Sequence, residues 1–373
     1  MQIAIDKNIL FAKEAFETLG EAQLFEQKDL TCENIRDFDA LIVRSTTKID
    51  ENLLSGTNIK FVGSAVGGTD HIDTEYLQKA DIAFSAATGC NSRSVAEYAL
   101  TAIYAFCEKK GLLPQNQTVG IIGVGNIGGM LAEILKNLGI KTILNDPIRE
   151  KTGEKGFSSL DFLAQNSDII TVHVPLTKSG EYKTQNLLDG KFFAKIKDGA
   201  LLIQASRGTV CDEEALLKAS PKMEAPVIDV WANEPDINID LAKNCMFHTP
   251  HIAGHSFDGK INGTKMIYDA CCAHFSKMPI FDFESKVFAK IETRTIEFGN
   301  SISEILLKCC PLDCDTRSFE CILSEKDVEN RKKMFKKLRQ NYQKRLEFKH
   351  YSIKNAPEKL RNELEILGFN VLK

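Results

Sequence analysis

Three residues that could carry out acid–base chemistry follow three successive strand-like runs. Arg207 comes after LLIQAS, Glu234 lies in the turn after APVIDVW, and His251 comes after CMFHTP. An imidazole beside a carboxylate can take the proton of an alcohol and, in reverse, protonate a carbonyl. A guanidinium can grip a carboxylate and the neighbouring oxygen of a 2-hydroxy acid as a planar fork. Singly, each residue also has an ordinary interpretation, as a surface ion pair, a turn residue or a helix cap.

A glycine-rich stretch provides a cofactor signal. Gly123, Gly125 and Gly128 have G-x-G-x-x-G spacing, directly after the strand-like TVGIIG and at the start of a helical stretch. The three glycines allow a tight turn, close approach of a pyrophosphate and close packing of helix on strand. The next strand-like run ends in Asp146, which can accept hydrogen bonds from ribose hydroxyls and would repel a 2′-phosphate. The sequence therefore predicts NAD rather than NADP, although Arg149 lies nearby.

The elements that must position these residues alternate between strands and helices. Strand-like runs such as QIAID and IKFVGSA alternate with amphipathic stretches in the first ninety residues, and a second such series runs from 92 to 255. This alternation predicts parallel sheets. We expect an α/β protein with two doubly wound parallel-sheet domains, a flavodoxin-like substrate domain and a Rossmann NAD domain, plus a C-terminal α+β domain.

The domain boundaries follow from shifts in composition and pattern. We expect a discontinuous substrate domain formed by residues 1–92 and 256–284, because the stretch after His255 looks helical and can pack back on the first series. The NAD-binding domain is expected at 93–255 and a C-terminal domain at 285–373.

The overall composition narrows the class of protein. A net charge of −4 argues against general nucleic-acid binding, and no apolar run approaches the ~20 residues of a membrane helix. The start lacks the pattern of a signal peptide, and eleven scattered cysteines suit reduced thiols in the cytoplasm. We expect no metal site. The basic stretch 331–349 is interpreted as a solvated helix face or a subunit interface, with phosphate binding as the alternative.

These motifs together resemble the D-isomer-specific 2-hydroxyacid dehydrogenases. The strand-Arg-Gly, Asp-x-Trp-x-x-Glu-Pro and Thr-Pro-His-Ile-Ala-Gly elements carry the resemblance, together with GVGNIG. The C-terminal KKLRQNYQKRLEF and LGFNVL are similar to a branch of the family with its own tail domain. Membership of that branch implies oxidation of 4-phospho-D-erythronate by NAD in pyridoxal 5′-phosphate biosynthesis, and a homodimer formed through the tail domain.

The resemblance also implies roles for individual residues. Arg207 and Glu234 would be catalytic, and His251 would accept the proton when the alcohol is oxidised. The glycine-rich motif and the resemblance together give these expected NAD contacts: Gly123, Gly125, Asn126, Ile127, Gly128, Asp146, Val174, Ala205, Ser206, Asp229 and Gly254. The substrate contacts that the resemblance implies are Ser45, Val66 and Gly67, and the chemistry of Arg44 and His255 makes them further candidates.

Two substrate-side positions depart from the family pattern. Val66 stands where a threonine is expected, and His255 stands where a tyrosine is expected. A valine can still offer its backbone N–H to a carboxylate. His255 has two interpretations, a substrate contact or a structural residue; a protonated ring would suit a phosphate.

The substrate phosphate needs a cation. Arg44 and Lys48 lie in RSTTK, which is either a phosphate-binding turn or a polar turn with Thr47 or Asp50 as a helix cap. Lys260 and the basic stretch are further candidates. Two other functions stay open: a phosphoglycerate-type or other D-2-hydroxyacid dehydrogenase, and an NAD-sensing corepressor-like scaffold.

Overall fold

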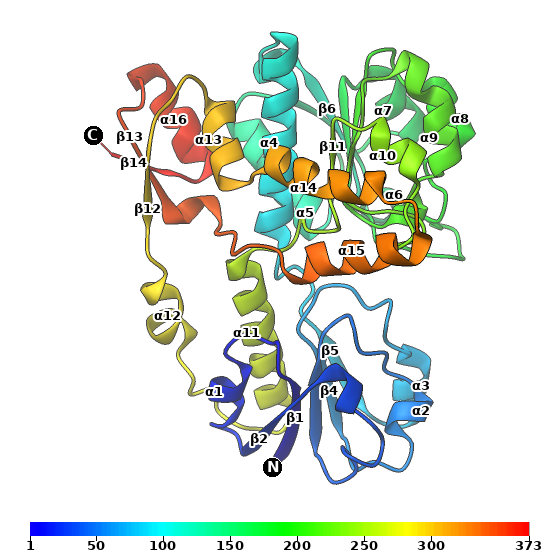
Figure 1. Ribbon diagram of the computed structural model, residues 1–373, viewed down its shortest axis with the longest axis vertical. Helices are drawn as coiled ribbons and strands as arrows, with labels where there is room; N and C mark the ends of the chain where they lie inside the picture. Colours follow the sequence, from blue (N-terminus) through cyan, green and yellow to red (C-terminus); the bar gives the residue numbers. More distant parts are fainter. Residues whose placement is uncertain (373) are drawn as a thin grey trace. The chain divides into compact units, whose positions relative to one another are not determined.

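A computed structural model describes residues 1–372 and divides into two compact units (Figure 1). The first unit comprises Met1–Asn91 and Ser256–Glu292, and the second comprises Ser92–His255 and Thr293–Lys373. The chain thus leaves the first unit at residue 91 and returns to it at 256. Residues 293–372 pack with 92–255 as one unit, and a separate functional role for a C-terminal domain stays a prediction.

The first unit is built on a five-stranded parallel sheet. Its strand order, β2-β1-β3-β4-β5, is the flavodoxin-like order. The strands are β1 (Gln2–Asp6), β2 (Glu21–Phe25), β3 (Ala40–Val43), β4 (Phe61–Ser64) and β5 (Ala83–Ala86). The helices are α1 (Ala12–Phe16), α2 (Glu51–Leu54), α3 (Thr74–Lys79), α11 (Phe257–His274) and α12 (Phe283–Lys286).

Both faces of this sheet are covered, as a buried parallel sheet requires. Side chains alternate along a strand, so Ile3 and Ile5 pack with Phe16 of α1 and Ile267 of α11 on one face. On the other face, Ala4 belongs to the cluster that contains side chains of α2 and α3. The returning helix α11 therefore completes the core of the first unit.

The second unit contains a six-stranded parallel sheet with the order β11-β10-β9-β8-β6-β7. The strands are β6 (Thr118–Ile122), β7 (Lys141–Asn145), β8 (Ile169–Val172), β9 (Leu201–Gln204), β10 (Val227–Ile228) and β11 (Phe247–His248). The helices are α4 (Ser92–Lys110), α5 (Asn126–Asn137), α6 (Pro147–Lys151), α7 (Leu160–Asn166), α8 (Gly190–Lys195), α9 (Glu213–Ala219) and α10 (Ile239–Lys243). An isolated parallel bridge from Leu144 to Phe157 lies where a further Rossmann strand would stand. The chain reverses its direction of winding between β6 and β8.

The C-terminal residues add a small three-stranded parallel sheet and four helices to the second unit. Its strands are β12 (Arg294–Glu297), β13 (Tyr351–Lys354) and β14 (Asn370–Val371), and its helices are α13 (Ile302–Cys309), α14 (Leu312–Ser324), α15 (Val328–Gln340) and α16 (Glu358–Leu367). Phe319 and Ile322 of α14 and Phe335 of α15 belong to the same hydrophobic core as Trp231. The orange α14 and α15 accordingly lie against the green part of this unit in Figure 1.

The predicted fold class is confirmed, but some local predictions need correction. The amphipathic stretch after β1 forms only the five-residue α1, and β2, which the sequence did not reveal, follows it. The basic stretch 331–349 is helical only to Gln340. Beyond that point the chain is irregular up to a short 3-10 helix, Phe348–His350, and residues 345–348 are buried because they pack inside the second unit. None of the helices in residues 1–372 combines the length and apolar character needed to cross a membrane.

Candidate active site

The three predicted catalytic residues all follow neighbouring strands of the second sheet. Arg207 comes after β9, Glu234 after β10 and His251 after β11, and these strands are adjacent and parallel. Their carboxyl ends therefore lie at one edge of the sheet, which is where open α/β sheets bind ligands.

His251 and Glu234 form a direct side-chain pair. His251 Nδ1 lies 2.8 Å from Glu234 Oε2, and both side chains are partly exposed, at 27% and 19%. The Trp231 N–H donates to the other oxygen, Oε1, at 2.9 Å. Burial alone would raise the pKa of the Glu234 carboxyl, but attraction to His251 and these hydrogen bonds hold it below its usual value. The carboxylate is thus fixed and ionised beside the imidazole.

The backbone at His251 has an unusual conformation. Its φ is +59°, in the left-handed region that non-glycine residues rarely adopt. The His251 N–H donates to the carbonyl of Asp229 at 2.8 Å, which ties the strained residue to the end of the neighbouring strand. Such conformations persist only where the surroundings impose them, and they concentrate at functional sites.

Asp229 holds the loop from 249 to 255 that carries His251. Its carboxylate, in a residue only 1% exposed, accepts hydrogen bonds from the Thr249 hydroxyl at 2.6 Å and from the Ile252 and Ala253 N–H groups at 2.7 and 3.0 Å. The Tyr98 hydroxyl adds a bond of 2.8 Å to Thr249 Oγ1. The predicted contact of Asp229 with NAD stays a prediction.

The turns that carry Arg207 and Glu234 pack on each other. A Cβ placed on Gly208 would lie 2.0 Å from the Trp231 carbonyl oxygen, so only glycine permits this approach. The Glu213 carboxylate accepts the Ala232 N–H at 2.7 Å, and the Trp231 indole donates to the Thr249 carbonyl at 3.0 Å. Arg207 is half-buried, and its Nη1 donates to the Ser206 carbonyl at 2.9 Å.

The glycine-rich loop has the geometry expected of a dinucleotide site. Gly123 has φ +84°, and a Cβ on Gly128 would lie 2.0 Å from the Gly123 carbonyl oxygen. Gly125 caps α5, and a Cβ there would meet nothing within 4 Å. Open space therefore lies before the free N–H groups of a twelve-residue helix, which suits a pyrophosphate.

Asp146 lies at the end of β7, beside this loop. Its carboxylate accepts the Val124 N–H at 2.9 Å and the Arg149 N–H at 3.1 Å, so it joins the strand end, the loop and α6. Arg149, the residue that left NADP open, is engaged by the carboxylate of Glu154 and by the Val124 carbonyl. This arrangement favours NAD.

The other predicted cofactor contacts lie at the same edge of the second sheet or in the loops beyond it. Asn126 and Ile127 begin α5, Val174 follows β8, Ala205 and Ser206 follow β9, and Gly254 lies in the loop after β11. Their contact with NAD stays a prediction.

The predicted substrate contacts lie in both units. Arg44 and Ser45 follow β3 of the first unit, and Val66 and Gly67 follow the adjacent β4. Arg44 binds the fully buried Asp6 through two nitrogens, at 3.0 and 3.3 Å. A phosphate would share the guanidinium with this carboxylate.

Lys48 and His255 also occupy defined surroundings. Lys48 pairs with Asp50 at 2.8 Å, and the Asp50 side chain caps α2. This agrees with the interpretation of RSTTK as part of a polar turn that ends in a helix cap. His255, in the second unit, has its ring 6.3 Å from that of Tyr342, and the Tyr342 hydroxyl donates to Asp315 at 2.8 Å. The substrate contact of His255 stays a prediction.

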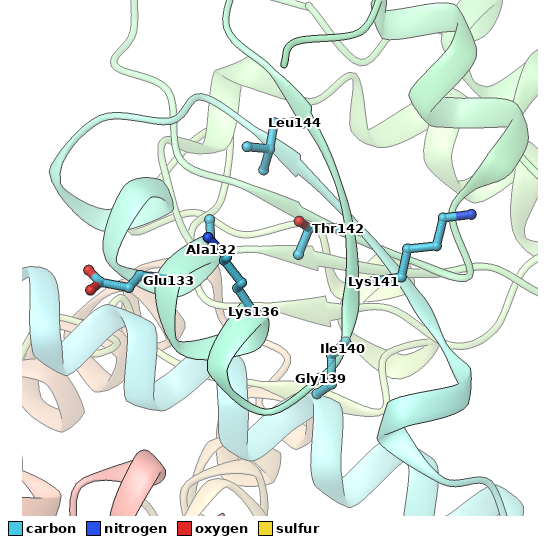
Figure 2. A pocket seen from close by; sticks show the side chains of 8 residues that line it. All are labelled: Ala132, Glu133, Lys136, Gly139, Ile140, Lys141, Thr142 and Leu144. Carbon is cyan, nitrogen blue, oxygen red and sulfur yellow. The ribbon is translucent and has the colours of Figure 1, made fainter. Parts of the chain in front are cut away.

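A surface hollow of about 680 Å³ is lined by none of these residues (Figure 2). It is lined by residues of α5, β7 and the turn between them: Ala132, Glu133, Lys136, Gly139, Ile140, Lys141, Thr142 and Leu144. Because β7 is the last strand of the sheet and none of these residues is a predicted contact, the hollow is not part of the candidate active site.

Metal ligands were not expected in this chain. Within residues 1–372 no group of three or more His, Cys, Asp or Glu side chains is placed to hold a metal ion. All eleven cysteines are free thiols.

Sequence reasoning missed several residues that build the site. Glu213 and Thr249 looked like ordinary helix-start and loop residues, and Tyr98 looked like part of an apolar helix. Their hydrogen bonds link segments up to 151 residues apart, so no local pattern could reveal them. The only signal was a polar residue within or beside an apolar run.

Comparison with known proteins gives consistent matches. Residues 103–253 match the model of the D-isomer specific 2-hydroxyacid dehydrogenase NAD-binding domain. The chain is 40% identical to an erythronate-4-phosphate dehydrogenase of Klebsiella pneumoniae, over 100% of this chain and 99% of that protein. It is 41% identical to one of Wigglesworthia glossinidia brevipalpis, over 99% of this chain and 98% of that protein.

Solved structures match over a shorter length. The NAD+-bound 3-phosphoglycerate dehydrogenase of Entamoeba histolytica has a TM-score of 0.64 at 26% identity, covering 74% of this chain and 95% of that one. A formate dehydrogenase of Staphylococcus aureus in complex with NAD has a TM-score of 0.60 at 23% identity, covering 76% of this chain and 97% of that one, and supports the fold alone.

Proposed function

The chain belongs to the erythronate-4-phosphate dehydrogenases of the D-isomer-specific 2-hydroxyacid dehydrogenase family, and from this premise we propose that His251 is the base of its reaction. That reaction is the oxidation of 4-phospho-D-erythronate by NAD to 2-oxo-3-hydroxy-4-phosphobutanoate and NADH. The enzyme name fits a place in pyridoxal 5′-phosphate biosynthesis.

The observation that carries this proposal is the 2.8 Å pair between His251 Nδ1 and Glu234 Oε2. A carboxylate on Nδ1 holds the proton there and leaves Nε2 free of a proton for the substrate. Nε2 then takes the proton of the C2 hydroxyl while the C2 hydrogen leaves with its electron pair. Glu234 stabilises the imidazolium that results.

NAD, when bound, supplies the acceptor for that hydride. The first N–H groups of α5 beyond Gly125 would bind its pyrophosphate, and Asp146 would bind the adenosine ribose. Arg207 would hold the substrate carboxylate and the oxygen on C2, which orients C2 and polarises the carbonyl in the reverse reaction. Ser45 and the backbone at Val66 and Gly67, which follow β3 and β4, would contact the substrate.

We further propose that the protein is a cytoplasmic homodimer formed through its C-terminal residues. The strand β12 supports this proposal, because it is an edge strand with mostly exposed side chains and could be covered by a second copy. Sedimentation analysis of the full chain tests it: a monomer at all concentrations would rule it out.

The enzymatic proposal is tested by measuring NADH formation with 4-phospho-D-erythronate, 3-phosphoglycerate and unphosphorylated D-2-hydroxy acids. A parallel run includes a 2-oxo acid, in case bound NADH has to be reoxidised in place. Preference for phosphoerythronate that disappears in His251→Ala supports the proposal. Activity only with 3-phosphoglycerate would support the phosphoglycerate-type alternative, and NAD binding without activity would support the scaffold.

A further inference from the structure

A buried arginine from the C-terminal residues reaches the loop that carries His251. Arg345 is only 3% exposed and follows α15 in the irregular segment that leads to the small C-terminal sheet. Its Nη2 donates to the Ala253 carbonyl and to the Ser94 hydroxyl, and also to the Ser94 carbonyl at 3.4 Å. Ala253 lies two residues after His251.

Burial of this charged guanidinium costs free energy, because it takes the charge out of water. The acceptors that it binds are two carbonyls, a hydroxyl and the Cys310 thiol at 3.2 Å, all of them neutral. Its Nε has no hydrogen-bond partner within residues 1–372. The buried carboxyls of Glu97 and Asp315 attract the guanidinium, although neither hydrogen-bonds to it. The direct contacts of Arg345 are therefore made to the start of α4 and to the loop that carries His251.

The contacts of Arg345 complete a clamp on the catalytic loop. From one side, the Asp229 carboxylate binds the N–H groups of Ile252 and Ala253. From the other side, Arg345 and the Ser94 hydroxyl, at 2.8 Å, bind the Ala253 carbonyl. Ala253, two residues after His251, is therefore fixed through both its N–H and its carbonyl, which opposes relaxation of the strained φ of His251.

Helix α14 supports the neighbouring strand ends. The Phe319 ring stacks on Trp231, with centroids 5.7 Å apart, and meets the His248 ring at 5.2 Å. Thr316 Oγ1 accepts the His248 N–H at 3.2 Å. The C-terminal residues thus contact the strand ends that precede both Glu234 and His251.

We propose that Arg345 is a positioning residue for catalysis, which sets the loop of His251 in its own subunit through the Ala253 carbonyl. The proposal rests on the role of His251 proposed above. The C-terminal residues therefore have a function within each subunit, besides any role in joining two subunits.

The test compares Arg345→Met and Arg345→Lys with the wild-type enzyme. Misplacement of a catalytic group by about 1 Å can lower a rate 100-fold, so we expect kcat to fall about 10- to 100-fold in Arg345→Met. The dissociation constant of NADH should change less than about 2-fold. The melting temperature should fall, because Arg345→Met removes a donor from buried acceptors and a charge that attracts Glu97 and Asp315, so kcat is measured well below that temperature. Arg345→Lys keeps the charge and one donor nitrogen and should recover part of kcat.

Two readouts separate positioning from damage to the fold. Trp231 is the only tryptophan, and its emission reports whether Phe319 still stacks on it. Deuterium at C2 of the substrate should give a larger isotope effect on kcat in Arg345→Met, because the hydride step becomes slower relative to product release. Unchanged emission with an increased isotope effect supports the proposal.

Matched variants complete the design. Arg331→Met removes an arginine of the same C-terminal region that binds only the carbonyls of Glu325 and Lys326, both at 3.1 Å, and should leave kcat unchanged. Ser94→Ala removes the second donor to the Ala253 carbonyl and should lower kcat about 5-fold, as the loss of one hydrogen bond predicts. If Arg345→Met does not fold, the kcat of Ser94→Ala tests the proposal in its place.

The proposal would be overturned if both Arg345→Met and Ser94→Ala had the kcat and isotope effect of the wild type. It would also be overturned if Arg331→Met lost as much kcat as Arg345→Met. The His251→Ala variant is measured beside them. Full activity in His251→Ala would overturn the proposed function instead, whatever the Arg345 variants show.

Discussion

His251 Nδ1 and Glu234 Oε2 lie 2.8 Å apart although 17 residues separate them in the chain. They meet because β10 and β11 are adjacent parallel strands that end at the same edge of the sheet. Hydrogen bonds from Trp231 and to Asp229 then fix each partner.

Glu234→Gln tests this pair. The amide keeps the shape of the side chain but cannot stabilise an imidazolium, so kcat should fall about 100-fold with little change in the affinity for NAD. Steady-state kinetics and NADH titration measure the two quantities. Activity equal to the wild type would show that the carboxylate takes no part in proton transfer.

A matched pair of glycines tests the cofactor loop. Gly128→Ala places a methyl group 2.0 Å from the Gly123 carbonyl oxygen and should weaken NADH binding at least about 10-fold by displacing the loop. Gly129→Ala meets only the Val124 carbonyl oxygen, at 3.6 Å, and should bind NADH normally. As a helix-interior change it should also stabilise α5 by up to about 1 kcal/mol. Equal NADH affinity in the two variants would contradict this account of the loop.

Asp146→Ser tests the choice of cofactor. Serine keeps an oxygen that can cap α6, but it removes the negative charge. The kcat/KM for NAD should therefore fall about 10- to 100-fold, which corresponds to the loss of one charge-assisted hydrogen bond. The value for NADP should fall less or rise, because the repulsion of a 2′-phosphate is removed. An unchanged ratio of the two values would exclude Asp146 from cofactor selection.

The stability of the second unit should depend on the buried Glu97. Burial raises the pKa of this carboxyl to about 8, and Glu347 adds to that rise, while Arg93 and the Phe348 N–H oppose it. Between an unfolded pKa near 4.5 and about 8, the folded protein holds a proton that the unfolded chain releases. The free energy of unfolding should therefore decrease as the pH rises through this range, by an amount on the order of a few kcal/mol.

Urea unfolding at a series of pH values measures this dependence. In Glu97→Gln the side chain stays neutral, so its contribution to the slope should vanish. The same slope in the wild type and in Glu97→Gln would contradict the prediction.

The sequence was sufficient for the parts of the structure that depend on local patterns. The glycine spacing after β6 and the continuous apolar runs of β8 and β9 identify a buried parallel sheet, and polar residues after such strands identify its functional edge. Arg207, Glu234 and His251 could be named as candidates in this way, and their catalytic roles stay a prediction. The direct pairing of the last two required the order of the strands.

Other features depend on tertiary contacts and left no local signal. Only two of the five residues of β2 are buried, so it lacks an apolar run. Arg345 belongs to a stretch with nine basic residues, a pattern that indicates an exposed helix. Its side chain is nevertheless buried, because it binds the Ser94 hydroxyl and the Ala253 carbonyl. The positive φ of His251 is imposed by the loop contacts and not by its residue type.

The most direct test of the central claim is the rate of NADH formation from 4-phospho-D-erythronate by the wild type and by His251→Ala, with NADH binding measured on both. We predict activity in the wild type, a loss of at least about 100-fold in His251→Ala, and equal affinity for NADH. Retained activity in His251→Ala, or a wild type that binds NADH but oxidises none of the 2-hydroxy acids, would contradict the account.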